Sequence, residues 1–134
     1  MAESIELEVA TPERAVVSEQ VTNVQVPGAN GYLGILPGHA PLLGLLGSGV
    51  LSYTAAGERH RLAVQGGLLE VLPGQVRVLA NLAERAEEID LAQARADLER
   101  AQQELQAAST GGDTTAALEA VALARARVAA AEGK

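Results

Sequence analysis

The hydrophobic pattern of the chain changes its period near Glu88, and this change limits the fold more than any other feature. Before Glu88, short segments alternate apolar and polar residues, as in 5–9, where Ile5, Leu7 and Val9 alternate with glutamates. After Glu88 there is no proline, and Ala, Leu, Gln, Glu and Arg predominate. Alternation with a period of two predicts strands, whereas strong helix formers without proline predict helices. We therefore expect an all-β part followed by an all-α part.

The first part contains further alternating segments with turn signals between them. The segments are 24–26, 62–64, 69–71 and 76–78. The turn-forming pairs are Pro27-Gly28, Ala56-Gly57 and Pro73-Gly74. Short strands at this spacing predict an antiparallel sandwich or barrel.

The second part carries two helical seams. On the first predicted helix, Leu and Ala residues each recur every seven positions, at Leu91, Leu98 and Leu105 and at Ala94, Ala101 and Ala108. Gly111-Gly112 interrupts this pattern, and Asp113 or Thr114 can cap a second helix. The seam of the second helix is Ala117, Val121, Ala124, Val128 and Ala131. Two helices with matching seams and a short link predict an antiparallel hairpin.

The alanine content of the hairpin has two interpretations. Alanine allows close helix approach but buries little area, at ~25 cal/mol per Å². We therefore expect a weakly held hairpin that can move. A GC-rich genome explains the same composition equally well.

Composition excludes several classes of function. The chain has 17 acidic and 10 basic residues, a formal net charge of −7, and Tyr32 and Tyr53 as its only aromatic residues. Nucleic-acid binding normally requires a basic face or stacking aromatics, so we predict no nucleic-acid partner. The chain has no cysteine, signal peptide or membrane-spanning stretch, so we expect any link to a membrane to run through a complex.

No catalytic or metal-binding motif is recognisable. Nucleophile elbows, phosphate-binding loops and dinucleotide fingerprints are absent from the sequence. His39 and His60 have no accompanying cluster of carboxylates. We predict no catalytic residue, no metal site and no cofactor.

Four segments resemble epsilon subunits of bacterial F-type ATP synthases, in family order. The segments are GYLGILPGHAPLL at 31–43, VQGGLLEV at 64–71, VRVLA at 76–80 and EID at 88–90. The first is quite specific, since it fixes the spacing of three Gly, two Pro and a His.

The resemblance implies an antiparallel β-sandwich at 1–86 and a helical hairpin at 87–134. It also implies a non-catalytic subunit of the rotor stalk, at the cytoplasmic face of the bacterial cell membrane. The implied partners are the gamma subunit, the loops of the c ring and, through an extended hairpin, the catalytic alpha and beta subunits. In that family the extended hairpin obstructs ATP hydrolysis.

The resemblance assigns roles to residues of a predicted loop at 31–41, which we call the glycine-rich loop. It implies contacts with the c ring or gamma by Gly31, Tyr32, Leu33, Gly34 and His39. Many family members carry an acid where this chain has Tyr32. The alternative is purely structural: Gly and Pro shape turns, and His39 hydrogen-bonds a backbone carbonyl.

The last helix contains Arg125 and Arg127, for which two roles compete. The resemblance implies that they meet acidic residues of the catalytic subunits when the hairpin extends. The alternative is that they complement the helix dipole. Because they are two positions apart, they point to different faces of the helix.

The alternative function is a nucleotide-sensing regulatory module, in which ATP bound at the hairpin stabilises the folded form. Some bacterial epsilon subunits bind ATP, and their motif places Ile89, Asp90, Ala94, Arg100 and Arg127 in the candidate site here. The chain departs from that motif, with Gln93 and Leu123 at positions where ATP binders carry basic residues. Asp90 as N-cap and Gln93 at N3 also form a pair like a capping box, which explains the same residues without a nucleotide.

Overall fold

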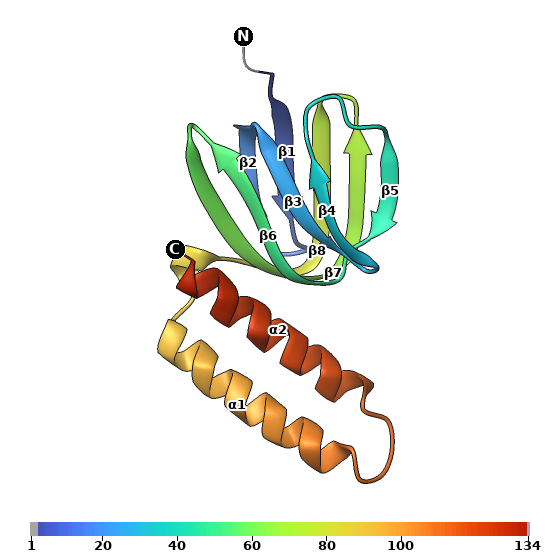
Figure 1. Ribbon diagram of the computed structural model, residues 1–134, viewed down its shortest axis with the longest axis vertical. Helices are drawn as coiled ribbons and strands as arrows, with labels where there is room; N and C mark the ends of the chain where they lie inside the picture. The colour runs from blue at the N-terminus through green and yellow to red at the C-terminus, as the bar shows by residue number, and fades with distance from the viewer. Residues whose placement is uncertain (1–2, 134) are drawn as a thin grey trace.

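The computed structural model describes residues 3–133. Strands form the N-terminal part of these residues, and two long helices form the C-terminal part (Figure 1). The strands are β1 (Ile5–Ala10), β2 (Ala15–Val21), β3 (Asn23–Gly28), β4 (Gly31–Ile35), β5 (Leu42–Leu45), β6 (Ser48–Ala55), β7 (Glu58–Leu72) and β8 (Gln75–Arg85). A short 3₁₀ turn, η1 (Ala86–Glu88), leads to α1 (Leu91–Ala108) and α2 (Thr115–Glu132). The predicted β-sandwich followed by two helices is confirmed.

The strands form one hydrogen-bonded path, in the order β2-β1-β8-β7-β6-β3-β4, with β5 paired to β7. All pairs are antiparallel except β1 and β8, which run parallel from Glu6 opposite Gln75 to Ala10 opposite Leu79. The prediction of a purely antiparallel sandwich is wrong for this pair. Parallel pairing requires a long connection, and the six strands between β1 and β8 provide it.

The inner faces of the strands carry a dense aliphatic core. The alternation predicted for β1 is confirmed, since Ile5, Leu7 and Val9 are buried. Tyr53 is the buried aromatic residue of this core, and its hydroxyl donates to the Glu19 carboxylate at 2.7 Å. Burial, together with that carboxylate, raises the pKa of Tyr53 to about 12.

One predicted turn is wrong. Pro27 and Gly28 are the last residues of β3, opposite Tyr32 and Gly31, and the turn lies at 29–30. Proline fits in this strand because β6 pairs with β3 only over 23–25, so the missing N–H removes no bond to β6. The turns at Ala56-Gly57 and Pro73-Gly74 are confirmed.

The helices form the predicted hairpin, and Figure 1 shows α2 next to the sandwich and α1 on the far side of α2. Asp90 caps α1, since its Oδ1 accepts from the Gln93 N–H at 3.1 Å. The side chain of Gln93 does not complete a capping box, because it donates to Asp97 at 2.9 Å instead. At the start of α2, Asp113 accepts from the Thr115 N–H at 2.8 Å.

Two glycines allow β7 to change partners. The strand pairs with β6 as far as Gln65 and with β5 from Leu68 onward. Between these positions, Gly66 and Gly67 have φ values of +66° and +116°, in the region that favours glycine. A Cβ atom on Gly67 would lie 2.0 Å from the backbone oxygen of Leu79. No other residue type fits there without moving β8.

We predict that Gly67→Ala destabilises the chain by roughly 3 kcal/mol or more, through the positive φ and the collision with β8. Gly74→Ala is the matched control, because Gly74 also has a positive φ, +72°, but faces open space. It should cost only about 1 kcal/mol. Urea unfolding followed by circular dichroism measures both losses. Equal losses would contradict the role assigned to the close approach.

Candidate functional site

The hairpin docks on the sandwich through small side chains. We call this contact the hairpin interface. Its buried residues are Ala63, Ala86, Ile89, Ala94, Ala126, Ala130 and Ala131, with Val50, Leu91 and Val128 packed around them. Alanine lets α2 approach the sheet closely, but each one contributes little buried area. The apolar contacts of the hairpin interface therefore contribute little free energy for the length of helix that they cover.

Within the hairpin, α1 and α2 pack along the predicted seams. Ala101, Val121 and Ala124 are buried there, with Leu98 and Leu105 against them. A second apolar face of α2, which was not predicted, carries Ala126 and Ala130 to the sandwich. Their spacing of four residues was the available signal.

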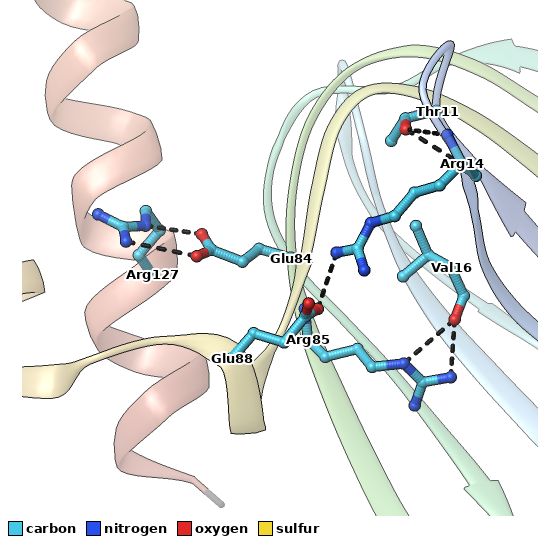
Figure 2. A network of polar contacts seen from close by, with 7 residues as sticks. All are labelled: Thr11, Arg14, Val16, Glu84, Arg85, Glu88 and Arg127. Atoms are coloured by element: carbon cyan, nitrogen blue, oxygen red, sulfur yellow. Dashed lines mark hydrogen bonds and ion pairs between the residues drawn. The ribbon is translucent and has the colours of Figure 1, made fainter.

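An arginine connects three elements at the edge of the hairpin interface. Arg127 of α2 donates from Nε to Glu84 Oε1 at 2.8 Å and from Nη2 to Glu84 Oε2 at 3.4 Å (Figure 2). Its Nη1 donates to Asp97 Oδ2 at 3.1 Å. Glu84 belongs to β8 and Asp97 to α1. The Glu84 carboxylate, with a smaller contribution from Asp97, raises the pKa of Arg127.

Asp97 collects hydrogen bonds from several side chains. Its Oδ1 accepts from Gln93 at 2.9 Å and from Arg100 at 2.8 Å, in addition to the bond from Arg127 to Oδ2. The Gln93 amide, followed by the two guanidinium groups, lowers the pKa of Asp97. Asp97 is therefore held as a carboxylate that fixes the position of Arg127.

A second network fixes the segment that leads from the sandwich into the hairpin. Glu88 Oε1 accepts from Arg14 Nη2 at 2.8 Å and from the Arg85 N–H at 3.0 Å (Figure 2). Arg85 in turn donates twice to the Val16 carbonyl, at 2.7 and 3.1 Å. The hydrogen bond from Arg14, followed by that from the Arg85 N–H, lowers the pKa of Glu88. The chain is thus anchored up to residue 88.

The candidate ATP-binding residues are placed in very different surroundings. Ile89 and Ala94 are buried in the hairpin interface, and Asp90 caps α1. Arg100 and Arg127 line an open groove between the helices, whose other lining residues include Asp97, Glu104 and Leu123. Both arginines already pair with Asp97. This arrangement opposes phosphate binding, because the basic groups face carboxylates of the chain itself.

The two arginines of the last helix lie in different environments, as their spacing predicted. Arg127 is three-quarters buried or more, with 21% of its side chain exposed. Arg125 is exposed, and it forms no hydrogen bond or ion pair with residues 3–133 in the structure. Arg125 is therefore accessible in this arrangement, whereas Arg127 is engaged with Glu84.

The glycine-rich loop lies at the other end of the sheet path. The prediction of a loop is wrong for its first residues, since Gly31, Tyr32, Leu33 and Gly34 belong to β4, the edge strand. The Tyr32 ring is half exposed, and its hydroxyl accepts from the Val50 N–H at 2.9 Å. His39 lies in the following loop, where Nδ1–H donates to the Ala40 carbonyl at 2.6 Å, as the structural alternative predicted.

Exposed leucines form a surface that the sequence analysis did not identify. We call it the leucine patch: Leu43 and Leu45 on β5, Leu68 on β7 and Leu79 on β8. Leu45, Leu68 and Leu79 are direct cross-strand neighbours, so they share one face of the sheet. Between 44% and 70% of each side chain is exposed. Consecutive leucines such as Leu68-Leu69 were the signal, because a strand sends one to each face.

The sandwich matches a known family. Residues 4–86 fit the sequence profile described as "ATP synthase, Delta/Epsilon chain, beta-sandwich domain". The chain belongs to the ATP synthase delta/epsilon family. The resemblance found in the glycine-rich loop and the following segments is confirmed.

Relatives in the delta/epsilon family extend the match through the hairpin. The ATP synthase epsilon chain of Solibacter usitatus is 58% identical over 134 residues, the full length of both chains. That of Koribacter versatilis is 52% identical over 79% of this chain and 75% of its own. That of Nitratidesulfovibrio vulgaris is 45% identical over 96% and 97%.

A solved structure shares the fold of this family member. A chain in the cryo-EM structure of the Euglena gracilis mitochondrial ATP synthase, OSCP/F1/c-ring, superposes with a TM-score of 0.80 at 23% identity. The match covers 95% of this chain and 81% of that one. Among the described residues, no helix has the length and apolarity to cross a bilayer, and no three His, Asp or Glu side chains are placed to hold a metal ion.

We predict that the contribution of Asp97 to stability is lost in acid. Its pKa in the folded chain lies below the unfolded value of about 3.9. Its carboxylate therefore stabilises the folded chain at pH values above that, and the contribution disappears as the pH falls through the lowered pKa. Urea unfolding of wild type and Asp97→Asn, from about pH 7 to about pH 3, measures the difference.

The stability gap between the two proteins should be constant near neutrality and should shrink below about pH 4. Glu99→Gln, which removes an exposed acid of the same helix, is the control and should stay close to wild type. A gap that does not change with pH would contradict the charged contact.

Proposed function

We propose that the chain is a non-catalytic subunit of the rotor stalk of a bacterial F-type ATP synthase, which couples the c ring to the gamma subunit and the catalytic core. The observation that carries this proposal is the full-length match to the Solibacter usitatus epsilon chain, at 58% identity. It spans both the sandwich and the hairpin. The complex would place the chain at the cytoplasmic face of the cell membrane, as a peripheral component.

The sandwich has two surfaces suited to partners in the stalk. The leucine patch is a contiguous apolar surface, of the kind that marks protein–protein contacts. The second surface is the edge strand β4 with Gly31, Tyr32, Leu33, Gly34 and the nearby His39. We propose that these surfaces contact gamma and the loops of the c ring. Because the hydroxyl of Tyr32 is bound to Val50, the ring itself supplies the exposed contact area.

The hairpin is suited to a movable restraint on hydrolysis. Its apolar docking rests largely on alanines, so its separation from the sandwich exposes little area. Its helices keep their own seam and caps when separated. We propose that the extended hairpin meets acidic residues of the alpha and beta subunits through Arg125 and Arg127 and obstructs rotation in the hydrolysis direction.

We predict that a chain ending at Glu88 raises ATP hydrolysis by the cognate catalytic core relative to the full chain. The reason is that truncation removes the restraint and leaves the sandwich intact. The measurement is steady-state hydrolysis by the reconstituted core, with co-purification of gamma showing that the sandwich stays bound. Equal rates with a bound sandwich would rule out the restraint and leave only the coupling role.

A second prediction separates this role from nucleotide sensing. Because Asp97 and Glu104 face Arg100 and Arg127, we expect the isolated chain to bind ATP with a millimolar or weaker dissociation constant. Isothermal titration of the full chain measures this value. Gln93→Arg combined with Leu123→Arg, which restores the basic positions of the ATP-binding motif, is the comparison and should bind more tightly. Micromolar binding by the wild type would establish the sensing role instead.

A further inference from the structure

The contact between Arg127 and Glu84 differs from the other polar contacts between α2 and the sandwich. Gln65 donates to the Glu119 carbonyl at 2.9 Å, and Arg61 donates to the Gly133 carbonyl at 2.6 Å. These two contacts end on main-chain oxygens. Among residues 3–133, the ion pair between α2 and the sandwich is the one formed by Arg127 and Glu84.

Partial burial and geometry make this ion pair stronger than a surface pair. The exposed side-chain fractions are 21% for Arg127 and 34% for Glu84. Two guanidinium nitrogens reach the two carboxylate oxygens. Charge-assisted bonds in such a fork are about twice as strong as neutral ones, and partly buried pairs are less screened by salt.

Asp97 has a different part in the network. It belongs to α1, so it moves with Arg127 when the hairpin leaves the sandwich, and their contact survives. Of the bonds that Arg127 makes, only those to Glu84 break on separation. Asp97 is thus a positioning residue, which holds the guanidinium toward Glu84 before the hairpin docks.

We propose that the Arg127–Glu84 pair, oriented by Asp97, is a ligand-independent latch that holds the hairpin against the sandwich. The alanine contacts supply shape but little free energy, so this pair decides how often the hairpin is released. The latch concerns the isolated chain. Only its effect on hydrolysis rests on the proposed function.

The test measures the docked fraction in the full chain by pulsed EPR. The chain has no cysteine, so spin labels attach only at introduced ones. The label sites are Glu58→Cys at the first residue of β7 and Gln102→Cys on α1, and both positions are exposed. A docked hairpin gives one narrow distance, and a released one adds a second, broad population. The measurements are made at a urea concentration that is too low to unfold the sandwich. At this concentration a measurable fraction of the wild-type hairpin is released.

We expect Glu84→Gln and Arg127→Gln each to raise the ratio of released to docked hairpin roughly tenfold or more. Arg100→Gln is the matched control, because Arg100 also binds Asp97, but within α1. It should leave the ratio within about twofold of wild type. The double variant Glu84→Gln/Arg127→Gln should release no more than either single variant, because the two residues act as one pair.

Asp97→Asn distinguishes positioning from direct latching. It should raise the ratio by less than Glu84→Gln does, since the pair with Glu84 remains. Added salt should release the wild-type hairpin and have less effect on Glu84→Gln. The latch is overturned if Glu84→Gln behaves like Arg100→Gln, or if the effects of Glu84→Gln and Arg127→Gln simply add.

The same variants separate the latch from the proposed function. Hydrogen exchange of the β6–β7 amides should match the wild type and so exclude loss of the sandwich. In the reconstituted core, Glu84→Gln should lower hydrolysis by favouring the extended hairpin. A raised released fraction with unchanged hydrolysis would sustain the latch and overturn the restraint on hydrolysis.

Discussion

The close approach of α2 to the sandwich depends on the size of the alanine side chain. Ala63 on β7 faces α2 residues Ala126 and Ala130, and larger side chains at these positions would push the helix away from the sheet. At that greater distance Arg127 would not reach Glu84. The same small side chains limit the apolar free energy of docking. The small alanine side chains therefore explain both the close contact and the low apolar free energy of docking. The close contact lets Arg127 reach Glu84, and the low apolar free energy makes that ion pair a larger share of the docking.

The sandwich core and the hairpin interface differ in the number and size of the side chains that pack in them. In the sandwich, branched aliphatic residues fill a core that is almost free of exposure, and the strands are joined in one hydrogen-bonded path. In the hairpin interface, contact is made by fewer and smaller groups. The proposed movement of the hairpin against a sandwich that stays attached would use this difference.

Local pattern predicted β1, β3, β7, β8 and both helices, because strand alternation and the heptad seam of α1 are properties of neighbouring residues. It predicted no strand for β2, β4, β5 or β6. It failed where the outcome depends on distant segments. The parallel pairing of β1 with β8 joins the ends of the domain, and no local pattern records it. Arg127 could be selected from the sequence, but its partner Glu84 lies 43 residues away and is one acid among 17. The leucine patch was missed because burial of a strand face depends on what packs over it.

The anchoring of Glu88 has a geometric consequence for any movement of the hairpin. Arg14 and the Arg85 backbone hold the chain up to this residue, so a pivot of the hairpin would lie at residues 89–90, next to the start of α1. The 18 residues of α1 form a lever about 27 Å long. A rotation of about 20° at the pivot moves the far end by roughly 9 Å. A small change of backbone angles at two residues is thus amplified into a displacement comparable to the width of a helix.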